Sequence, residues 1–188
     1  MSLILIGAGG HAKVVNDSAM RSTLNPIGFI DDNVDDFLGL KKISESVFLE
    51  NAREYTAIIA FGAVTAAAAA RRHNLYMQYK NQGVKFFSVR DPSATISSLA
   101  KINNGVVIFP NAVVNAAAQI DENVIINTSA VIEHEVKIGA GSHICPGAIV
   151  LGGAEIGSNC IIGAGAVILP YSKVEASTLV PALTRFPK

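Results

Sequence analysis

The sequence predicts two parts of different fold class: an α/β N-terminal domain over residues 1–90 and a parallel β-helix of hexapeptide repeats over residues 91–188. The first prediction rests on short apolar strands that alternate with helix-forming segments, and the second on an apolar residue that recurs at every sixth position. The period changes at Asp91-Pro92-Ser93, a turn-forming sequence that we take as the boundary between the two parts.

The N-terminal part has the pattern of a small parallel sheet with helices packed on it. Apolar segments typical of buried strands occupy residues 3–6, 27–30, 57–61 and 86–87. Helix-forming segments occupy residues 12–20 and 65–80, and the second of them contains an alanine run of high helix propensity. Short connections between alternating strands and helices favour parallel pairing.

The repeat in the second part is uninterrupted. Each repeat begins with a β-branched apolar residue, and these residues are Ile96, Ile102, Ile108, Val114, Ile120, Ile126, Ile132, Ile138, Ile144, Val150, Ile156, Ile162, Ile168 and Val174. The fourth residue after each is small or apolar, as in Ala112, Ala130 and Cys160. Three repeats make one triangular coil, in which both residues point inward and stack on their copies in neighbouring coils. The remaining positions face outward or turn the chain.

Composition and charge argue against nucleic-acid binding, membrane insertion and a disulfide-stabilised fold. Lys and Arg number 15, as do Asp and Glu, so net charge favours neither nucleic acid nor an anionic membrane as partner. No apolar run reaches the ~20 residues of a membrane span. The two cysteines, Cys145 and Cys160, give no disulfide framework, which favours a cytoplasmic location. We expect Cys160 to point inward and Cys145 outward, neither with a catalytic role.

The outward positions of the coil could carry chemistry, and His134 is the main candidate. It stands beside Glu135 at an expected corner, and a carboxylate next to an imidazole suits general-base catalysis. The alternative, that His134 is only a polar corner residue, stays open. A zinc site from His134, Glu135 and His143 lacks any ligand-spacing motif, so no metal is predicted.

A second candidate is the glycine-rich sequence Gly7-Ala8-Gly9-Gly10-His11, which follows the first strand and precedes a helix. Glycines there let a phosphate approach backbone amides, although a tight turn alone would also need them. Asp31-Asp32 ends the next strand, where an acidic residue commonly meets a ribose hydroxyl. Together they suggest a nucleotide-bearing ligand. His73, beside Arg71-Arg72, is expected on a solvated helix face.

With these motifs the chain resembles the bacterial sugar acyltransferases that join a Rossmann-like N-terminal domain to a left-handed β-helix. The resemblance covers nearly the whole chain. It rests on the hexapeptides and on residues 7–11, 29–32 and 127–135. Members acetylate the amine of nucleotide-linked amino sugars, such as UDP-4-amino-4,6-dideoxy sugars and GDP-perosamine. Others are sialic-acid O-acetyltransferases. The resemblance implies acetyl-CoA as co-substrate, no metal and a homotrimer.

The resemblance also implies roles for individual residues. It makes His134 the general base and Glu135 its support. The nucleotide sugar would be bound by residues of the two N-terminal loops, namely Gly9, Gly10, His11, Asp31 and Asp32. The acetyl-CoA groove would be lined by three residues of the coil, namely Asn127, His143 and Gly152.

Two departures from the family pattern affect these expectations. Gly62-Ala63 stands where relatives often have Gly-Asn, which removes one polar contact to the nucleotide sugar. Residues 177–188 lack the usual closing segment, which bears on contacts to the far end of CoA. The predicted activity is therefore N-acetylation of a nucleotide-linked amino sugar. The alternatives are O-acetylation of a sugar and a non-catalytic trimeric sugar-binding scaffold.

Overall fold

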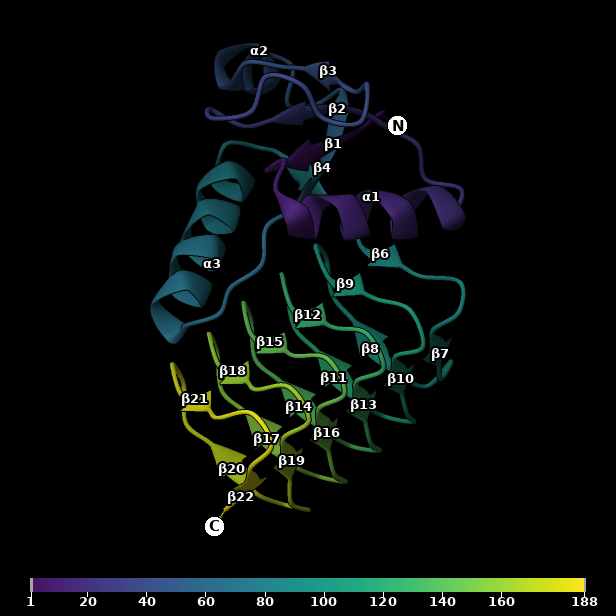
Figure 1. Ribbon diagram of the computed structural model, residues 1–188, viewed down its shortest axis with the longest axis vertical. Helices are drawn as coiled ribbons and strands as arrows, with labels where there is room; N and C mark the ends of the chain where they lie inside the picture. The colour runs from purple at the N-terminus through teal and green to yellow at the C-terminus, as the bar shows by residue number, and fades with distance from the viewer. Residues whose placement is uncertain (1, 188) are drawn as a thin grey trace.

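The computed structural model describes residues 2–187 and confirms the predicted fold class. Five parallel strands form the N-terminal sheet in the order β3-β2-β1-β4-β5 (Figure 1). These strands are β1 (Ser2–Ile6), β2 (Pro26–Ile30), β3 (Lys41–Lys42), β4 (Tyr55–Ile59) and β5 (Lys85–Phe86). The chain order reverses at β1, and in open α/β sheets such a point lies beside the ligand crevice.

Three helices cover this sheet. They are α1 (Gly10–Arg21), α2 (Glu45–Glu50) and α3 (Ala66–Asn81). Helix α1 packs its apolar residues on one face of the sheet, whereas α2 and α3 pack on the other. The sequence patterns miss β3 and α2, because a two-residue strand and a six-residue helix are too short to show a period.

The coil consists of two-residue strands, each paired in parallel with the strand 18 residues further on, as Ile132 is with Val150. It has three flat faces, which we name from their outward side chains. The covered face holds β6 (Val89–Arg90), β9 (Val107–Ile108), β12 (Ile125–Ile126), β15 (His143–Ile144), β18 (Ile161–Ile162) and β21 (Leu179–Val180).

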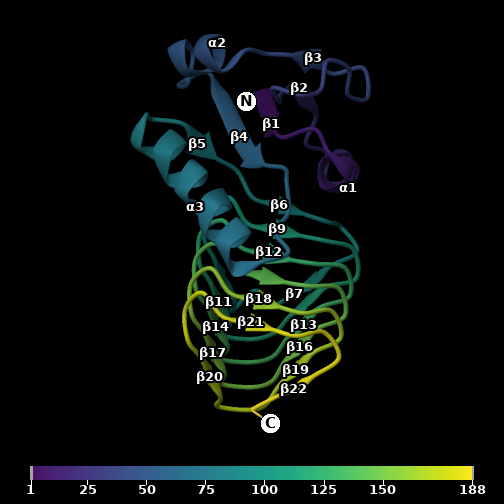
Figure 2. The same cartoon turned by 60° about the vertical axis from the view of Figure 1, so that its left-hand side comes forward.

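The other two faces are uncovered. The apolar face holds β7 (Thr95–Ile96), β10 (Val113–Val114), β13 (Val131–Ile132), β16 (Ile149–Val150), β19 (Val167–Ile168) and β22 (Arg185–Phe186). The charged face holds β8 (Lys101–Ile102), β11 (Gln119–Ile120), β14 (Lys137–Ile138), β17 (Glu155–Ile156) and β20 (Lys173–Val174). Figure 2 shows the coils stacked one below another, with the charged face at the left and the apolar face at the right.

The inward column forms as the repeat predicts. From Ile108 to Val174 the branched residues and their small companions are buried in one continuous core. The coil extends beyond the uninterrupted repeat, since β6 precedes it and β21 and β22 follow it. Arg90 pairs with Ile108 and Phe186 with Ile168, so the sequence pattern fades at both ends while the backbone pairing continues.

The N-terminal domain lies on the covered face. Val89, Val107 and Ile125 are fully buried there and share one core cluster with Val15 of α1 and Leu5 of β1. Helix α1 therefore sits between the sheet and the coil (Figure 1). Because this core is shared, the sheet and the coil are held in one defined arrangement.

A buried guanidinium joins the two parts. Arg72 of α3 is fully buried and donates hydrogen bonds to the carbonyl oxygens of Ile59, Phe61 and Asn123. The first two lie at the end of β4, and Asn123 lies at a coil corner. Arg72 makes no ion pair within residues 2–187, and burial lowers the pKa of its guanidinium to about 9.

The prediction of a solvated helix face around His73 is wrong. His73 is half-buried, its ring stacks on Tyr76 with 5.9 Å between centroids, and burial lowers its pKa. Helix α3 packs one side on the sheet and another on the coil. The alanine run in its sequence shows no apolar period that would mark these two buried sides. Cys145, expected to face outward, is half-buried against the cluster of Ala63, Ala69 and Ile161, of which Ala69 belongs to this helix.

Within residues 2–187, no helix combines the length and the apolar character needed to cross a membrane.

Replacing Arg72 by Met should lower the free energy of unfolding by about 2–4 kcal/mol, because three buried carbonyl oxygens lose their donor. Arg71→Met is the matched control, since Arg71 is exposed on the same helix and should change stability by less than about 0.5 kcal/mol. Denaturant unfolding of both variants measures the difference. Equal effects would show that the buried guanidinium does not hold the two parts together.

Candidate functional site

The glycine-rich loop and the acidic residues meet at the carboxyl ends of β1 and β2, as expected. The backbone N–H of Ala8 donates to Asp31 Oδ2 at 2.9 Å, and that of Asn33 donates to Asp31 Oδ1 at 2.9 Å. Oδ2 of Asp31 therefore ties the second loop to the first, while Oδ1 fixes the turn of its own loop. Asp32 is exposed beside them.

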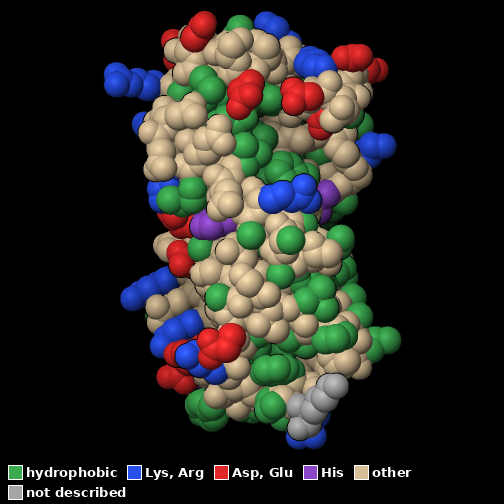
Figure 3. All heavy atoms as spheres, turned by 90° about the vertical axis from the view of Figure 1, so that its left-hand side faces the viewer, with side chains coloured by type: hydrophobic (Ala, Val, Ile, Leu, Met, Phe, Trp, Pro, Cys, Tyr) green, Lys and Arg blue, Asp and Glu red, His purple; other side chains and the backbone are tan. Residues whose placement is uncertain are grey.

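These loops border an open pocket of about 290 Å³, which is lined by Ile6, Gly7, Ile30, Asp31, Asp32, Asn33, Glu45, Phe61, Leu75 and Tyr79. Glu45 and Tyr79 were not predicted from the sequence; the Tyr79 hydroxyl donates to Glu45 Oε1 at 2.8 Å. Burial raises the pKa of Tyr79, and the Glu45 carboxylate raises it further, so the phenol stays a neutral donor. Figure 3 shows acidic side chains gathered on the N-terminal domain.

Gly9 and Gly10 lie where α1 begins. Gly9 is the N-cap and contributes no side-chain cap, and a Cβ at either glycine would meet no atom within 4 Å. Packing alone does not require glycine at these positions. The open space leaves the first backbone amides of α1 accessible to a ligand.

His11 points away from the acidic pocket and into the junction between the domain and the coil. Its ring meets Phe109 edge-on with 5.2 Å between centroids and lies 6.4 Å from the ring of His143. Burial first, then the charges of Arg72 and His143, lower its pKa to about 3. The neutral ring has a buried Nε2 that finds no hydrogen-bond partner in the described part of the chain.

His143 is held in one tautomer by the junction. Its Nδ1–H donates to the carbonyl oxygen of Ala63 at 2.7 Å, which leaves Nε2 to accept from Asn127 Nδ2 at 2.9 Å. Burial lowers the pKa of His143 to about 4, the bond to Ala63 opposes this, and the charge of Arg72 adds to it. Residues 62–63, noted as a departure from the family pattern, thus supply a backbone contact. Gly62 also lies against the ring of His11.

His134 lies elsewhere, at the corner between the apolar and charged faces. Its side chain is 55% exposed, and Nδ1 lies 3.3 Å from Glu135 Oε2. A Cβ at Gly152 would come within 2.6 Å of His134 Nε2, so glycine is required beneath the ring. The carboxylate orients Nδ1 as the donor and leaves Nε2 as the basic atom.

Apart from the loop residues Gly9, Gly10, Asp31 and Asp32, the predicted site residues form two groups in one chain. His134, Glu135 and Gly152 share one corner, whereas His11, Asn127 and His143 lie at the covered face. Figure 3 shows histidine side chains at the level where the N-terminal domain meets the coil. Gly152, expected beside Asn127 and His143, belongs with His134.

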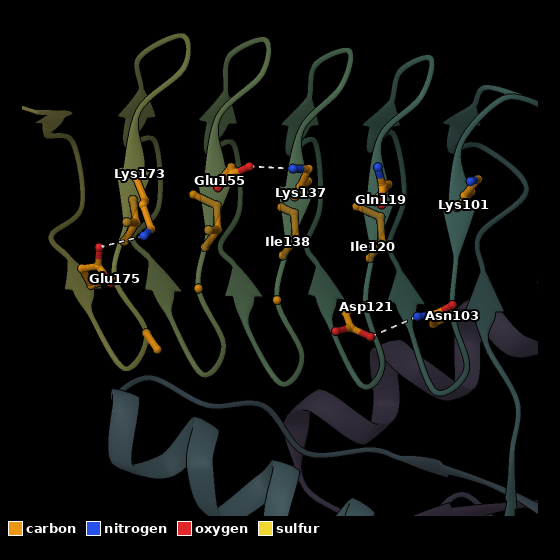
Figure 4. A pocket seen from close by; sticks show the side chains of 15 residues that line it. Lys101, Asn103, Gln119, Ile120, Asp121, Lys137, Ile138, Glu155, Lys173 and Glu175 are labelled. Atoms are coloured by element: carbon orange, nitrogen blue, oxygen red, sulfur yellow. Dashed lines mark hydrogen bonds and ion pairs between the residues drawn. The ribbon is translucent and has the colours of Figure 1, made fainter.

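The charged face contains a shallow groove of about 520 Å³ that holds neither group (Figure 4). Lys137 pairs with Glu155 at 2.6 Å and Lys173 with Glu175 at 3.4 Å, while Asn103 binds Asp121. Positive and negative side chains balance along this face, which suits contact with water. In residues 2–187 no cluster of three or more His, Cys, Asp or Glu is placed to hold a metal ion.

Comparisons with known proteins agree with this architecture. Residues 2–78 match the model of the PglD N-terminal domain, and residues 135–170 match the six-repeat bacterial transferase hexapeptide model. A sequence comparison with curated proteins gives no match.

Solved structures match over nearly the whole chain. The acetyltransferase domain of PglB from Neisseria gonorrhoeae is 30% identical with a TM-score of 0.90, over 98% of this chain and 90% of that one. The same domain has been solved with acetyl coenzyme A, at 30% identity and a TM-score of 0.88, over 96% and 88% of the two chains. PerB from Caulobacter crescentus, in complex with CoA and GDP-perosamine, is 28% identical with a TM-score of 0.88, over 97% and 86%.

The buried histidines predict how stability depends on pH. The unfolded chain takes up protons near pH 6.5, whereas folded His143 and His11 do so only near 4 and 3. Their contribution to stability is therefore complete above pH 6.5 and is lost as the pH falls toward 4. Unfolding midpoints measured from pH 7.5 to 4.5 should fall, and a His11→Gln, His143→Gln double variant should fall less steeply. Parallel curves would contradict this assignment.

Proposed function

Because the chain belongs to the hexapeptide-repeat sugar acetyltransferases with a PglD-type N-terminal domain, we propose that it acetylates the amine of a nucleotide-linked amino sugar. The acetyl donor is acetyl-CoA, as the acetyl-CoA complex of the PglB domain supports. The proposed acceptor class is a UDP-4-amino-4,6-dideoxy sugar. The GDP-perosamine bound to PerB makes a GDP-linked amino sugar the comparison to test.

The observation that carries the proposal is the environment of His134. The imidazole is exposed, faces a carboxylate with Nδ1 and lies with Nε2 against Gly152, where the missing side chain keeps the space open. The amine of the acceptor attacks the thioester carbonyl, and Nε2 takes the proton that the amine loses. Collapse of the tetrahedral intermediate breaks the carbon–sulfur bond, and the proton on Nε2 passes to the departing thiolate. Glu135 holds the ring and stabilises its protonated form.

The nucleotide sugar occupies the pocket at β1 and β2. Both carboxylate oxygens of Asp31 accept hydrogen bonds from backbone N–H groups, so this residue positions the loops. Asp32, which lines the same pocket, contacts the nucleotide. The diphosphate lies over Gly9 and Gly10 at the start of α1, where the amides offer donors and the helix dipole favours negative charge. No basic side chain lines the described pocket, so these amides are the groups suited to the phosphates.

The acetyl end of the donor lies near Asn127 and His143. Asn127 Oδ1 accepts from the N–H of Thr128 and one Nδ2 hydrogen goes to His143, which leaves the second Nδ2 hydrogen for the ligand. His11 lies beside this pair with a buried Nε2 that can meet the sugar. A neutral His143, held by its bond to the carbonyl oxygen of Ala63, keeps this arrangement fixed.

A second copy of the chain completes the site. His134 and the junction residues lie on different sides of one coil, so one chain cannot bring them to the same acetyl group. A homotrimer, in which the corner of one coil meets the covered face of the next, brings them together. Three-fold closure of this kind is a common form of symmetric assembly.

The apolar face is the surface suited to this association. Its outward residues Val113, Val131, Ile149 and Val167 are half-exposed and form an unbroken apolar column. The charged face carries ion pairs, and the covered face is occupied by the N-terminal domain. In Figure 3 apolar side chains gather at the right of the coil and charged ones at its left, the sides on which Figure 2 places these faces.

Replacing His134 by Gln should lower kcat by about 10²- to 10⁴-fold, because proton removal from the amine loses its base. The substitution lies at an exposed corner, so the unfolding temperature should stay within about 2 °C of that of the parent protein. Release of free CoA thiol with UDP- and GDP-linked amino sugars measures the rate. Unchanged turnover in the folded variant would exclude His134 as the base.

The same assay separates the competing functions. Thiol release with a sugar hydroxyl acceptor but no amino sugar would indicate O-acetylation. Absence of a thermal shift with both acetyl-CoA and nucleotide sugars would favour a scaffold, because a bound ligand must stabilise the fold.

Replacing Ile149 by Lys should dissociate the trimer, because a charge would enter the centre of an apolar interface. Gln119→Lys, at an exposed position on the charged face, is the control and should leave assembly intact. Light scattering coupled to size-exclusion chromatography gives the mass of each variant. A trimeric Ile149→Lys protein would show that another face mediates association.

A further inference from the structure

A further pocket lies at the N-terminal end of the coil, where the chain passes from the sheet into the first strands of the β-helix. Its volume is about 520 Å³, and we call it the end pocket. Figure 1 shows β6, the first strand of the coil, below α1. The lining combines residues of the loop after α1, of the connection into β6 and of the first coil, including Ser22, Leu24, Phe87, Arg90 and Ile102. A pocket of this size can enclose a small organic molecule.

Arg90 stands where the repeat would place a branched apolar residue. It lies six residues before Ile96 and pairs with Ile108, so it shares the register of the inward column. Its side chain is nonetheless exposed, because β6 is the end strand of its sheet. Arg90 therefore brings a positive charge to the open end of the apolar core.

This charge is not neutralised within residues 2–187. The guanidinium of Arg90 takes part in no ion pair or hydrogen bond there, and only its backbone carbonyl is held, by the hydroxyl of Ser22. The adjacent carboxylate of Asp91 is already bound by Arg21 and Ser93. None of the described residues that line the end pocket is Asp or Glu. The pocket therefore offers a cation that an external anion can meet.

Phe87 and Leu24 give the end pocket an apolar wall. Phe86 and Phe87 alternate at the edge of the sheet, so that Phe86 is buried in the core whereas Phe87 is 45% exposed. The backbone N–H of Phe87 donates to the carbonyl oxygen of Ala57 at 2.9 Å, which fixes the chain that carries the ring. An exposed ring on a fixed backbone is a surface on which a planar group can pack.

Ser88 holds the connection between the ring and the cation in place. Its hydroxyl donates to the carbonyl oxygen of Asn103 at 2.9 Å and accepts from the backbone N–H of Val106 at 3.1 Å. Both bonds tie the connection to the coil. The spacing between Phe87 and Arg90 is therefore set by the fold before any ligand binds.

The end pocket is separate from the proposed catalytic groups. Backbone pairing leads from Arg90 through Ile108 and Ile126 to Ile144, the residue after His143. Three strand spacings of about 4.8 Å place Arg90 about 14 Å from that level. A molecule in the end pocket would not touch the groups proposed for acetyl transfer.

We propose that the end pocket is a second ligand site, which binds a planar aromatic carboxylate with its ring on Phe87 and its carboxylate on Arg90. A guanidinium fork pairs with the two oxygens of one carboxylate, and the lining holds a single cation for a single negative charge. A phosphate monoester carries about two charges at neutral pH, and the second would meet no cation in this lining. The aromatic ring of the ligand is shielded from water by Phe87 and Leu24.

Binding of 2-naphthoate to the whole chain, followed by ligand-detected NMR, tests the proposal, with the neutral 2-naphthamide as the matched probe. We expect a Kd of about 0.2–1 mM for 2-naphthoate from its size. 2-Naphthamide should bind about fivefold more weakly, because it lacks the charge that meets Arg90. Arg90→Gln should remove this difference by weakening 2-naphthoate alone. Phe87→Ser should weaken 2-naphthoate about fivefold and keep the ratio between the two probes.

Two exposed residues of similar chemistry outside the pocket are the matched controls. Arg71→Gln removes an exposed guanidinium from α3, and Val47→Ser removes an apolar side chain that is 46% exposed on α2. Both variants should bind 2-naphthoate as the parent protein does. Equal losses in the controls and in the Arg90 and Phe87 variants would overturn the proposal, because the probe would then bind the surface at large.

A purely structural role for Arg90 predicts a different result. If Arg90 only covered the end of the core, Arg90→Gln would lower the unfolding temperature and keep the preference for the carboxylate, which would overturn the proposal. A parent protein that binds 2-naphthoate no more tightly than about 5 mM would overturn it too.

Competition separates the end pocket from the proposed acetyl-transfer site. 2-Naphthoate should bind equally well with CoA and a nucleotide sugar present, whether or not the protein acetylates that sugar. Displacement of 2-naphthoate by either compound would place the probe in the acetyl-transfer site and overturn the proposal. Tighter binding of 2-naphthyl phosphate than of 2-naphthoate would overturn the assignment of a carboxylate ligand.

Discussion

The in-register stacking of inward branched side chains is the constraint on which this molecule depends. Each strand of the coil is only two residues long and has no stability of its own, so the backbone bonds between coils form only if every coil repeats the same turn. The column from Ile108 to Val174 enforces that repetition, because a slip of one residue would turn a branched side chain outward. Register in turn sets every relation along the outside, including the placement of His134 directly over Gly152.

The junction between the two parts is built differently, with polar groups at its centre. Among residues 2–187, Arg72 is a buried cation whose hydrogen-bond partners are all carbonyl oxygens, and its positive potential extends to His11 and His143. A nearby cation and low water access both disfavour protonation of those rings. The bond from His143 to Ala63 then leaves one tautomer and a single role for Asn127. The same guanidinium therefore joins the domain to the coil and helps to set the protonation of the residues between them.

Much of the fold could be predicted from the sequence, because the coil is a repeat and the apolar positions of each repeat define its inward side. The inward positions, the corner at His134 and the meeting of Asp31 with the glycine-rich loop follow from local periods and strand ends. Arg72, His73 and Tyr79 could not be predicted, because their surroundings come from β4, the coil and α2, which are distant in sequence. An arginine in an alanine-rich helix gives no local sign that both sides of the helix will be covered.

The three faces of the coil show how one repeat can support three different environments. The inward residues are nearly identical on every face, so the outward column of each strand is free to vary without loss of the fold. That column is buried under α1 on one face, apolar on the second and charge-balanced on the third. His134 stands where the apolar and charged faces meet, and the junction histidines stand on the covered face, so no bending of a rigid coil can bring them together. If both groups act on one acetyl group, the assembly is part of the catalytic machinery: an isolated chain would hold a nucleotide sugar and a base that cannot reach each other.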